Sequence, residues 1–380
     1  MPPLLWTSIT IAIIGTSRWV VHLFHDAVSI AILVCCGRDT LQQRTPGLSE
    51  PRAIGKGQCG EIWTRVGSVV VTKTNNPGKE DQLWNDSCMH RLIEETMRTT
   101  PTSLQRDINI PKFEMLASLT HKFWNDVPEH IRPNIKPKYG LVSSRIRPVT
   151  EALRRDIVKA FAPSSANKRS ALTELENQDC LVRLYLGRRE KRFDRQAFRL
   201  RNFDLMVNEM EELQLDTSKF AAIMGKTLSI LHWSAHVDAD DVEFVLGRSP
   251  TLKMRASATD CNDSNKDDVC QDFTSDERHN VIWLLDFDQC KSLDDNDAGI
   301  KQLMQSFYFN DPYYPRPEAN HPNDVALWAT FRDNYLEASG LLTAIMMPAR
   351  FIEAVETEAR RRKAGGSIFG RSDNNAGYRK

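Results

Sequence analysis

The chain has 380 residues and a mass of 43.4 kDa, enough for two lobes or two domains with separate cores. Lys and Arg together number 50, as do Asp and Glu, so the formal net charge is zero. A balanced charge gives no overall positive field, so we expect no nucleic-acid partner and no attraction to an anionic membrane surface.

The cysteines carry no metal signature. None of the eight forms a Cys-x-x-Cys pair, so the sequence predicts no zinc module. We interpret them as reduced thiols of an intracellular protein, cytoplasmic or nuclear.

Two apolar stretches, residues 4–15 and 19–36, open the chain. Arg18 and Asp26 keep each stretch below the roughly 20 apolar residues that a membrane span requires, so we expect no span. A signal peptide starts with basic residues, and no Lys or Arg precedes Arg18. A helical hairpin on the domain and a non-native extension are the preferred interpretations, and a membrane anchor stays open as an alternative.

Runs of apolar and turn-forming residues predict the elements of the first half. In chain order, these are a linker over 37–52, a strand over 66–73, a helix over 83–97, a strand over 139–148 that enters a polar hinge, a loop over 163–167 and a strand over 181–186.

In the second half, Asp216 is the expected N-cap of a helix that leads into a loop at residues 233–238. Residues 248–280 are rich in Asp, Asn, Ser and Lys, which predicts a disordered insertion. The remaining expected elements are a buried strand over 281–285, amphipathic helices over 331–342 and 351–359, and a mobile polar tail.

Gly55, Gly57 and Gly60 form a Gly-x-Gly-x-x-Gly pattern, in which a backbone without side chains can approach phosphates. A dinucleotide site would need a helix directly after the glycines, whereas residues 61–63 and 69–71 read as strands. The pattern therefore favours a phosphate-covering hairpin of the kinase type, with a simple hairpin turn as the alternative.

Lys73 ends the second of these strands, where a strand-borne lysine would contact nucleotide phosphates. Such a lysine needs an acidic partner on the following helix. Asp86 is the best candidate, with Glu94 and Glu95 as alternatives.

Residues 236–246, His-Val-Asp-Ala-Asp-Asp-Val-Glu-Phe-Val-Leu, resemble the catalytic loop of the protein kinase and aminoglycoside phosphotransferase superfamily. The resemblance places Asp238 at the aspartate that accepts the acceptor's proton. Glu243 stands where the family has a magnesium-binding asparagine. For His236, a core role that braces the loop is the simpler interpretation.

Asp286, Phe287 and Asp288 resemble the magnesium segment of the same superfamily, with Asp286 as the metal ligand. An acidic third position is similar to the small-molecule kinase branch, including choline-kinase-like enzymes. Crowded carboxylates resist simultaneous ionisation, which a divalent cation would relieve. Without a metal, these side chains would face solvent or take up protons.

Several further segments, including residues 145–148, 180–187, 241–247 and 347–352, resemble a fungal family of uncharacterised proteins with a domain of unknown function, sometimes labelled zinc-finger-like. The resemblance covers about residues 53–360 and implies no known activity.

We therefore predict an α+β, two-lobed, protein-kinase-like fold. Its parts are an apolar extension and linker (1–52), a β-rich N-lobe (53–148), a mostly helical C-lobe (149–360) with an insertion (248–280), and a tail (361–380). The expected function is ATP- and Mg²⁺-dependent phosphoryl transfer to an unknown, small-molecule or protein acceptor. The alternative is a catalytically degraded pseudokinase that serves as an interaction module.

Overall fold

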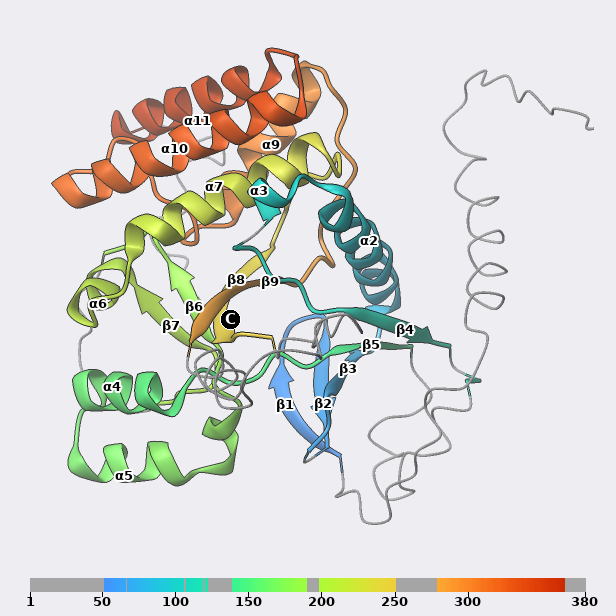
Figure 1. The fold of residues 1–380 in the computed structure, drawn as a ribbon, viewed down its shortest axis with the longest axis vertical. Coiled ribbons are helices and arrows are strands. Elements are labelled where there is room, and N and C mark those ends of the chain that lie inside the picture. Colours follow the sequence, from blue (N-terminus) through green and yellow to red (C-terminus); the bar gives the residue numbers. More distant parts are fainter. Residues whose placement is uncertain are drawn as a thin grey trace, which may run out of the picture. The chain divides into compact units, whose positions relative to one another are not determined.

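A computed structural model of the chain describes residues 51–365, apart from residues 66, 106, 119, 122–138, 190–197 and 251–278 (Figure 1). The expectations for residues 1–50 and for most of the polar segment 248–280 lie outside this described part. Among the described helices, none combines the length and apolar character needed to cross a membrane.

Five antiparallel strands form the N-terminal sheet, in the order β1-β2-β3-β5-β4. They are β1 (Arg52–Lys56), β2 (Gly60–Thr64), β3 (Val70–Asn75), β4 (Phe113–Ala117) and β5 (Gly140–Ser144). Helix α2 (Glu80–Thr99) packs against the sheet, and the short α3 (Thr102–Gln105) follows it (Figure 1). The predicted strand 66–73 and helix 83–97 are therefore confirmed with shifted ends.

Four strands form a second sheet in the order β7-β6-β8-β9. They are β6 (Val182–Tyr185), β7 (Phe203–Met206), β8 (Glu243–Arg248) and β9 (Asn280–Leu285). β8 and β9 pair antiparallel from Glu243–Leu285 to Arg248–Asn280, and the Ser249 amide donates to the His279 carbonyl at 3.0 Å. The expected insertion 248–280 is thus wrong at both ends, because β-sheet pairing extends through these residues.

Helices make up most of the C-terminal region. They are α4 (Glu151–Phe161), α5 (Ser165–Thr173), α6 (Val207–Glu212), α7 (Thr217–Trp233), α9 (Asp297–Phe309), α10 (Pro322–Leu342) and α11 (Met347–Lys363), with a 3-10 turn at Leu175–Asp179. Together with the β-rich N-terminal sheet, they confirm the predicted α+β class.

Several helices begin or end at other residues than the turn-forming residues of the sequence predict. Asp216 caps α7 as predicted, since its carboxylate accepts from the Lys219 amide at 2.9 Å. The predicted loop 163–167 is wrong, because Ser164 caps α5 and the helix begins at Ser165. The tail predicted over residues 361–380 is wrong for its first three residues, because α11 continues to Lys363, and residues 366–380 lie outside the described part.

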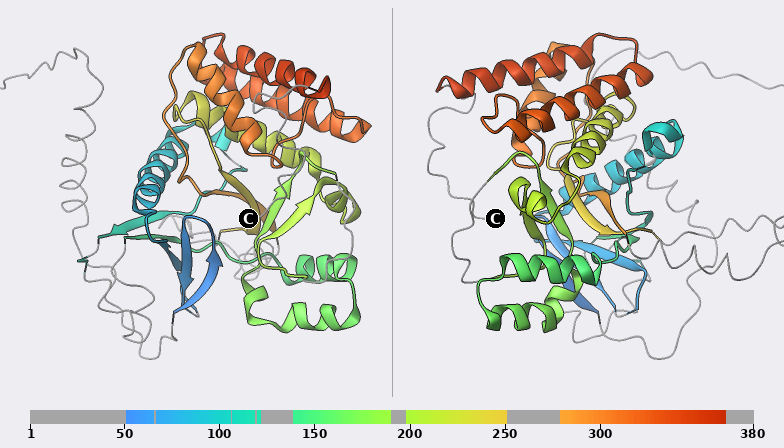
Figure 2. Two further views of the ribbon diagram at one scale, coloured as in Figure 1. Left: turned by 180° about the vertical axis from the view of Figure 1, so that it is seen from behind. Right: turned by 60° about the vertical axis from the view of Figure 1, so that its left-hand side comes forward.

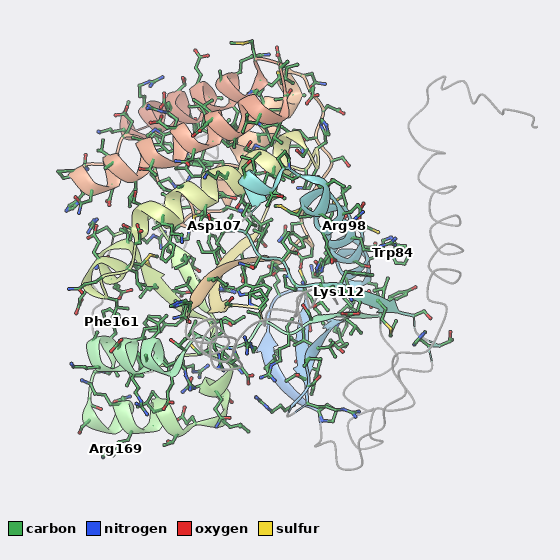
Figure 3. The ribbon with its side chains drawn as sticks, in the orientation of Figure 1. Trp84, Arg98, Asp107, Lys112, Phe161 and Arg169 are labelled. Atoms are coloured by element: carbon green, nitrogen blue, oxygen red, sulfur yellow. The ribbon has the colours of Figure 1, made fainter. Side chains whose placement is uncertain are left out.

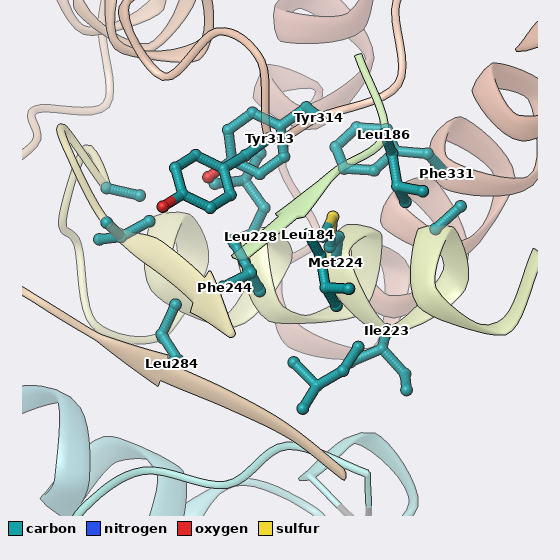
Figure 4. Packing of buried hydrophobic residues seen from close by; sticks show 14 of the residues in the cluster. Leu184, Leu186, Ile223, Met224, Leu228, Phe244, Leu284, Tyr313, Tyr314 and Phe331 are labelled. Atoms are coloured by element: carbon teal, nitrogen blue, oxygen red, sulfur yellow. The ribbon is translucent and has the colours of Figure 1, made fainter. Parts of the chain in front are cut away.

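The main core surrounds α7, and residues on nearly every face of this helix are buried. Figure 4 shows Met224 and Leu228 of α7 beside Leu184 of β6 and Phe244 of β8. On its other side, α7 packs against α10, as Figure 2 also shows. Phe161 of α4, which is labelled in Figure 3, stacks on Phe203 of β7 with ring centroids 6.1 Å apart.

Direct contacts tie the first sheet to the second. The Asn109 amide nitrogen donates to the Ile282 carbonyl at 2.9 Å, and the Leu284 amide donates to the Asn109 carbonyl at 2.8 Å. Asp179 is buried and pairs with both Arg52 of β1 and Arg145, which follows β5. These contacts hold the two sheets together, and the predicted site residues lie where the sheets meet.

Candidate functional site

Lys73 lies at the centre of the candidate site. Its ammonium is 2.6 Å from Asp86 Oδ2, 2.7 Å from Asp286 Oδ1 and 3.3 Å from Asp288 Oδ2. Burial alone would lower the pKa of Lys73, but the three carboxylates together raise it well above its ordinary value. The structure therefore brings together a strand lysine, a helix carboxylate and the acidic residues after β9.

Helix α2 positions Asp86. One carboxylate oxygen faces Lys73, and the other accepts from the Phe287 amide at 3.2 Å. His90, one turn further along α2, packs on the Phe287 ring with centroids 5.4 Å apart. Asp86 therefore links Lys73 to the Asp-Phe-Asp segment, whereas Glu94 accepts from the Phe113 amide and Glu95 pairs with Arg98.

The Asp-Phe-Asp segment leaves β9 with Asp286 in the left-handed region at φ +65°. His236, Ala239 and Asp241 in the loop before β8 also have positive φ, and such strained residues cluster at functional sites. The Asp286 side chain is 31% exposed, whereas that of Asp288 is only 4% exposed. Burial, and then repulsion from Asp286, raises the pKa of Asp288 to about 6, although Lys73 opposes this.

The glycine turn between β1 and β2 is short. The Gly57 amide donates to the Gly60 carbonyl at 2.8 Å, and the Asn76 amide group holds the Gly57 and Gln58 carbonyls at 3.1 and 2.9 Å. A Cβ on Gly60 would lie 2.1 Å from the Thr74 carbonyl oxygen, so a hairpin contact requires glycine there. A Cβ on Gly55 would press on Ile62 at 3.1 Å, whereas one on Gly57 would make only an ordinary contact with the Gly60 carbonyl oxygen at 3.9 Å.

Cys59 at the tip of this turn faces Asp288. Burial, followed by the hydrogen bond to Asp288, raises the pKa of the Cys59 thiol to about 12. The turn therefore lies against the acidic segment after β9.

Asp238 is deeply buried, with 1% of the residue exposed. Its Oδ1 accepts from the Lys291 amide at 2.9 Å and from the Asp240 amide at 3.2 Å, and its Oδ2 accepts from Gln302 at 2.8 Å. Burial raises the pKa of Asp238, and these hydrogen bonds oppose the rise. Both oxygens thus have protein donors.

The core interpretation of His236 is wrong, because its side chain is 53% exposed.

Glu243, at the start of β8, pairs with Arg183 of β6, 2.6 Å away. Burial raises the pKa of Glu243 to about 7 despite this arginine, and Asp286 and Asp241 add to the rise. Since Glu243 is paired with Leu285 across the hairpin, it stands close to Asp286. Among the described residues, no three His, Cys, Asp or Glu side chains are grouped to hold a metal ion.

Two cavities border the acidic segment on the side of α2. One of about 350 Å³ is lined by residues including Gln58, Cys59 and Gln289. The other, of about 510 Å³, is a more open groove lined by residues including Asn85 and Asp288. Neither is lined by Lys73 or Glu243.

Several partners of these residues were not found from the sequence. Asp288 contacts Lys73 across more than two hundred residues, Arg183 pairs with Glu243, and Gln302 donates to Asp238. No local pattern marks these contacts. The one signal in the sequence was Asp288 itself, a charged residue at the position where the related kinase segment has glycine.

Comparisons with known proteins agree with the domain of unknown function expected from the sequence. Residues 282–344 match the model of a family described as "Zinc finger protein", a domain of unknown function. This matched segment contains one cysteine, Cys290, and one histidine, His321, too few for the four ligands of a zinc finger. No curated protein matches the sequence.

Among solved structures, similar ones include aminoglycoside 2'-phosphotransferase-IIIa with GDP, both as a single-residue mutant (10% identity, 90% of this chain and 99% of that chain, TM-score 0.24) and as the wild type (10%, 88% and 99%, 0.23). A thermostable mutant of aminoglycoside phosphotransferase APH(4)-Ia without ligand is similar at 11% identity, covering 84% of this chain and 98% of that chain with a TM-score of 0.24. These scores are too low to support an inference about function.

Proposed function

We propose that this protein is a kinase-like, nucleotide-binding protein that transfers phosphoryl groups from ATP with Mg²⁺. The observation that carries the proposal is the contact of Lys73 with Asp86 and Asp286. Protein kinases need a strand lysine paired with a helix carboxylate, and a metal-binding aspartate, in place together. In this chain, β3, α2 and the end of β9 supply the three groups.

The donor set is compatible with Mg²⁺. Protein sites for Mg²⁺ commonly use one or two carboxylates and leave the other positions to water and substrate phosphates. Asp286 and Glu243 would hold the metal, which would supply positive charge to the phosphates. Within this proposal, Lys73 binds the phosphates, Gly55, Gly57 and Gly60 cover them, and Asp86 positions Lys73.

Asp238 would receive the proton of the acceptor, but its hydrogen bonds favour a second candidate. A general base must lie within hydrogen-bond reach of the proton that it takes. Asp238 is only 1% exposed, and its carboxylate already accepts three hydrogen bonds, from Lys291, Asp240 and Gln302. We therefore keep the pseudokinase, a fold retained as an interaction module, as the alternative.

The test of nucleotide binding is a thermal shift with ATP and Mg²⁺, because a ligand that binds only the folded state raises the melting temperature. Lys73→Ala should remove the shift. Because this change leaves three carboxylates without their cation, Lys73→Arg is a second variant that keeps the charge but not the compact ammonium. Lys112→Ala is the matched control, since Lys112 is exposed and pairs with Glu114, away from the glycine turn.

A wild type without any shift at millimolar nucleotide would contradict the proposal. A shift together with turnover of ATP that Asp238→Asn abolishes would support the phosphotransferase. A shift without turnover, tried with proteins and with small alcohols and amines as acceptors, would support the pseudokinase.

A further inference from the structure

The ammonium of Lys73 has three N–H donors, and the structure supplies three carboxylate acceptors for them. A phosphate group can bind Lys73 only if it replaces at least one of these carboxylates. Asp86 and Asp286 have roles in the proposed site, as the helix partner and as the metal ligand. Asp288 has none, so it is the partner to explain.

Hydrogen bonds from helix α2 and burial of the side chain hold Asp288 in place. The Asn85 side chain of α2 donates to the backbone carbonyls of Asp288, at 3.0 Å, and of Cys290, at 2.9 Å. The Asp288 side chain is buried with 4% exposed, so its carboxylate is not a surface charge that happens to reach Lys73.

The third contact of Asp288 reaches the turn between β1 and β2. The Cys59 thiol faces the Asp288 carboxylate, and burial, followed by this interaction, raises the pKa of the thiol. The backbone amide of Asn76 donates to the Cys59 carbonyl at 2.9 Å, which positions Cys59 within the turn. Asp288 therefore connects Lys73, which would bind phosphate, with the turn that would cover it.

We propose that Asp288 is an internal competitor for phosphate at Lys73 and that, through Cys59, it keeps the β1–β2 turn closed over the site until a nucleotide displaces it. This inference rests on the proposed nucleotide binding. Two anions compete for one ammonium, so Asp288 weakens the binding of any phosphate. A metal-bound triphosphate carries less negative charge than the free one and is therefore repelled less.

Asp288→Asn tests the inference, because it removes the charge and keeps the size. The affinity for ATP is measured with EDTA and again with Mg²⁺. We expect metal-free ATP to bind at least about tenfold more tightly to the variant, since one unit charge a few ångström away is worth this much or more. The gain with Mg²⁺ should be smaller. Asp240→Asn is the matched control, because Asp240 pairs with Lys291 and does not contact Lys73.

A second measurement needs no nucleotide. The rate at which a maleimide modifies Cys59, followed by mass spectrometry of its peptide, reports whether the turn is held against Asp288. It should increase in Asp288→Asn, while Cys88 on α2 should react at an unchanged rate in the same sample. If Asp288→Asn fails to fold, Asp288→Ala removes the same charge without burying a new amide, and it should also tighten metal-free ATP binding.

Faster modification of Cys59 together with tighter metal-free ATP binding would support the inference. Equal ATP affinity and equal Cys59 reactivity in wild type and Asp288→Asn would overturn it, while nucleotide binding itself would stand. Absence of ATP binding in the wild type and in both aspartate variants would instead overturn the proposed function and the competitor role with it.

Discussion

Lys73 is one cation among three carboxylates, two of which are almost fully buried. A buried charge is costly without its partner, and the loss of one member of such a cluster costs more than the cluster as a whole contributes. The cluster therefore makes Lys73 a structural residue as well as a candidate for phosphate binding. A substitution of Lys73 should therefore lower the stability of the fold even when no ligand is present.

Lys73→Ala should lower the free energy of unfolding by about 3–5 kcal/mol, because it leaves carboxylates buried without a counter-charge. Lys73→Arg should cost less, since it keeps the charge. Urea unfolding at neutral pH measures both. Lys56→Ala, at a side chain that is 73% exposed, should stay within about 0.5 kcal/mol of the wild type. Equal values for Lys73→Ala and Lys56→Ala would show that the cluster does not stabilise the fold.

His232 predicts how stability depends on pH. Burial in α7 lowers the pKa of His232 to about 3, and its Nδ1 lies 3.0 Å from the Tyr335 hydroxyl. The unfolded chain takes up a proton at this histidine below its ordinary pKa of about 6.5, but the folded chain does not. The stabilising effect of the neutral ring is therefore complete above this pH and is lost as the pH falls toward 3.

His232→Gln removes the titration and keeps an amide near Tyr335. The difference in unfolding free energy between wild type and variant should shrink by about 2 kcal/mol between pH 7 and pH 5, because one pKa unit corresponds to about 1.4 kcal/mol. Urea unfolding at a series of pH values measures this difference, in which other groups cancel. Parallel pH profiles would contradict the assignment of a neutral, buried His232.

At the residue scale, the sequence predicted contacts that depend on local spacing. Lys73 and Asp86 are 13 residues apart, on a strand and the helix that follows it, and their pairing was predicted. The contact of Asp288 with Lys73 spans 215 residues, and that of Arg183 with Glu243 spans 60. The first contact depends on how the two sheets approach each other and the second on the pairing of β6 with β8 within one sheet, and the neighbours of these residues along the chain record neither.

At the scale of elements, strong periodicity and caps were informative. Asp216 and the apolar face of α7 predicted that helix, and the continuous apolar run of β9 predicted the strand. Strands such as β7 and helices such as α4 were not predicted. β7 has four residues and gains its stability from parallel pairing with β6, which a short sequence window does not contain.

Helices α7 and α10 cross so closely that one of them needs a glycine. A Cβ on Gly225 of α7 would lie 2.4 Å from the Phe331 carbonyl oxygen and 3.1 Å from the Tyr335 amide nitrogen. Backbone atoms cannot move aside as a flexible side chain can. The two helices must therefore separate to accept even one methyl group.

Gly225→Ala should destabilise the protein by about 1–3 kcal/mol, the usual cost of an overpacked core. Gly340→Ala is the matched control, because a Cβ on Gly340 of α10 meets nothing within 4 Å. Alanine is a better helix former than glycine, so this control should gain up to about 1 kcal/mol. Thermal unfolding compares the two variants, and a stabilised Gly225→Ala would contradict the close crossing.

At the scale of the whole molecule, the two sheets meet through few but specific contacts. Asp179 forms ion pairs with Arg52 and Arg145. The Arg147 side chain donates to the Ser249 carbonyl at 2.6 Å, and Asn109 forms a hydrogen bond with β9. The β8–β9 hairpin takes part in two of these contacts. Its end at Ser249 and His279 is therefore anchored from the side of the first sheet, independently of the residues between them.

This anchoring leads to a prediction about residues 251–278, which join β8 to β9. Their sequence is rich in Asp, Asn and Ser and poor in aromatic residues. The hairpin pairs fully up to Arg248 and Asn280. Loop closure depends only weakly on length, roughly 0.6 kcal/mol per doubling, so a shorter connection should cost the hairpin little and can even favour it.

Replacing residues 251–278 with a short Gly-Ser turn should leave the melting temperature of the protein within a few degrees of the wild-type value. Differential scanning calorimetry measures this. The control keeps the length of the segment and replaces its residues with a Gly-Ser repeat, which separates the effect of length from that of composition. A large drop with both replacements would mean that side chains of the segment stabilise the fold. A drop with the short turn alone would mean that β8 and β9 need the longer connection.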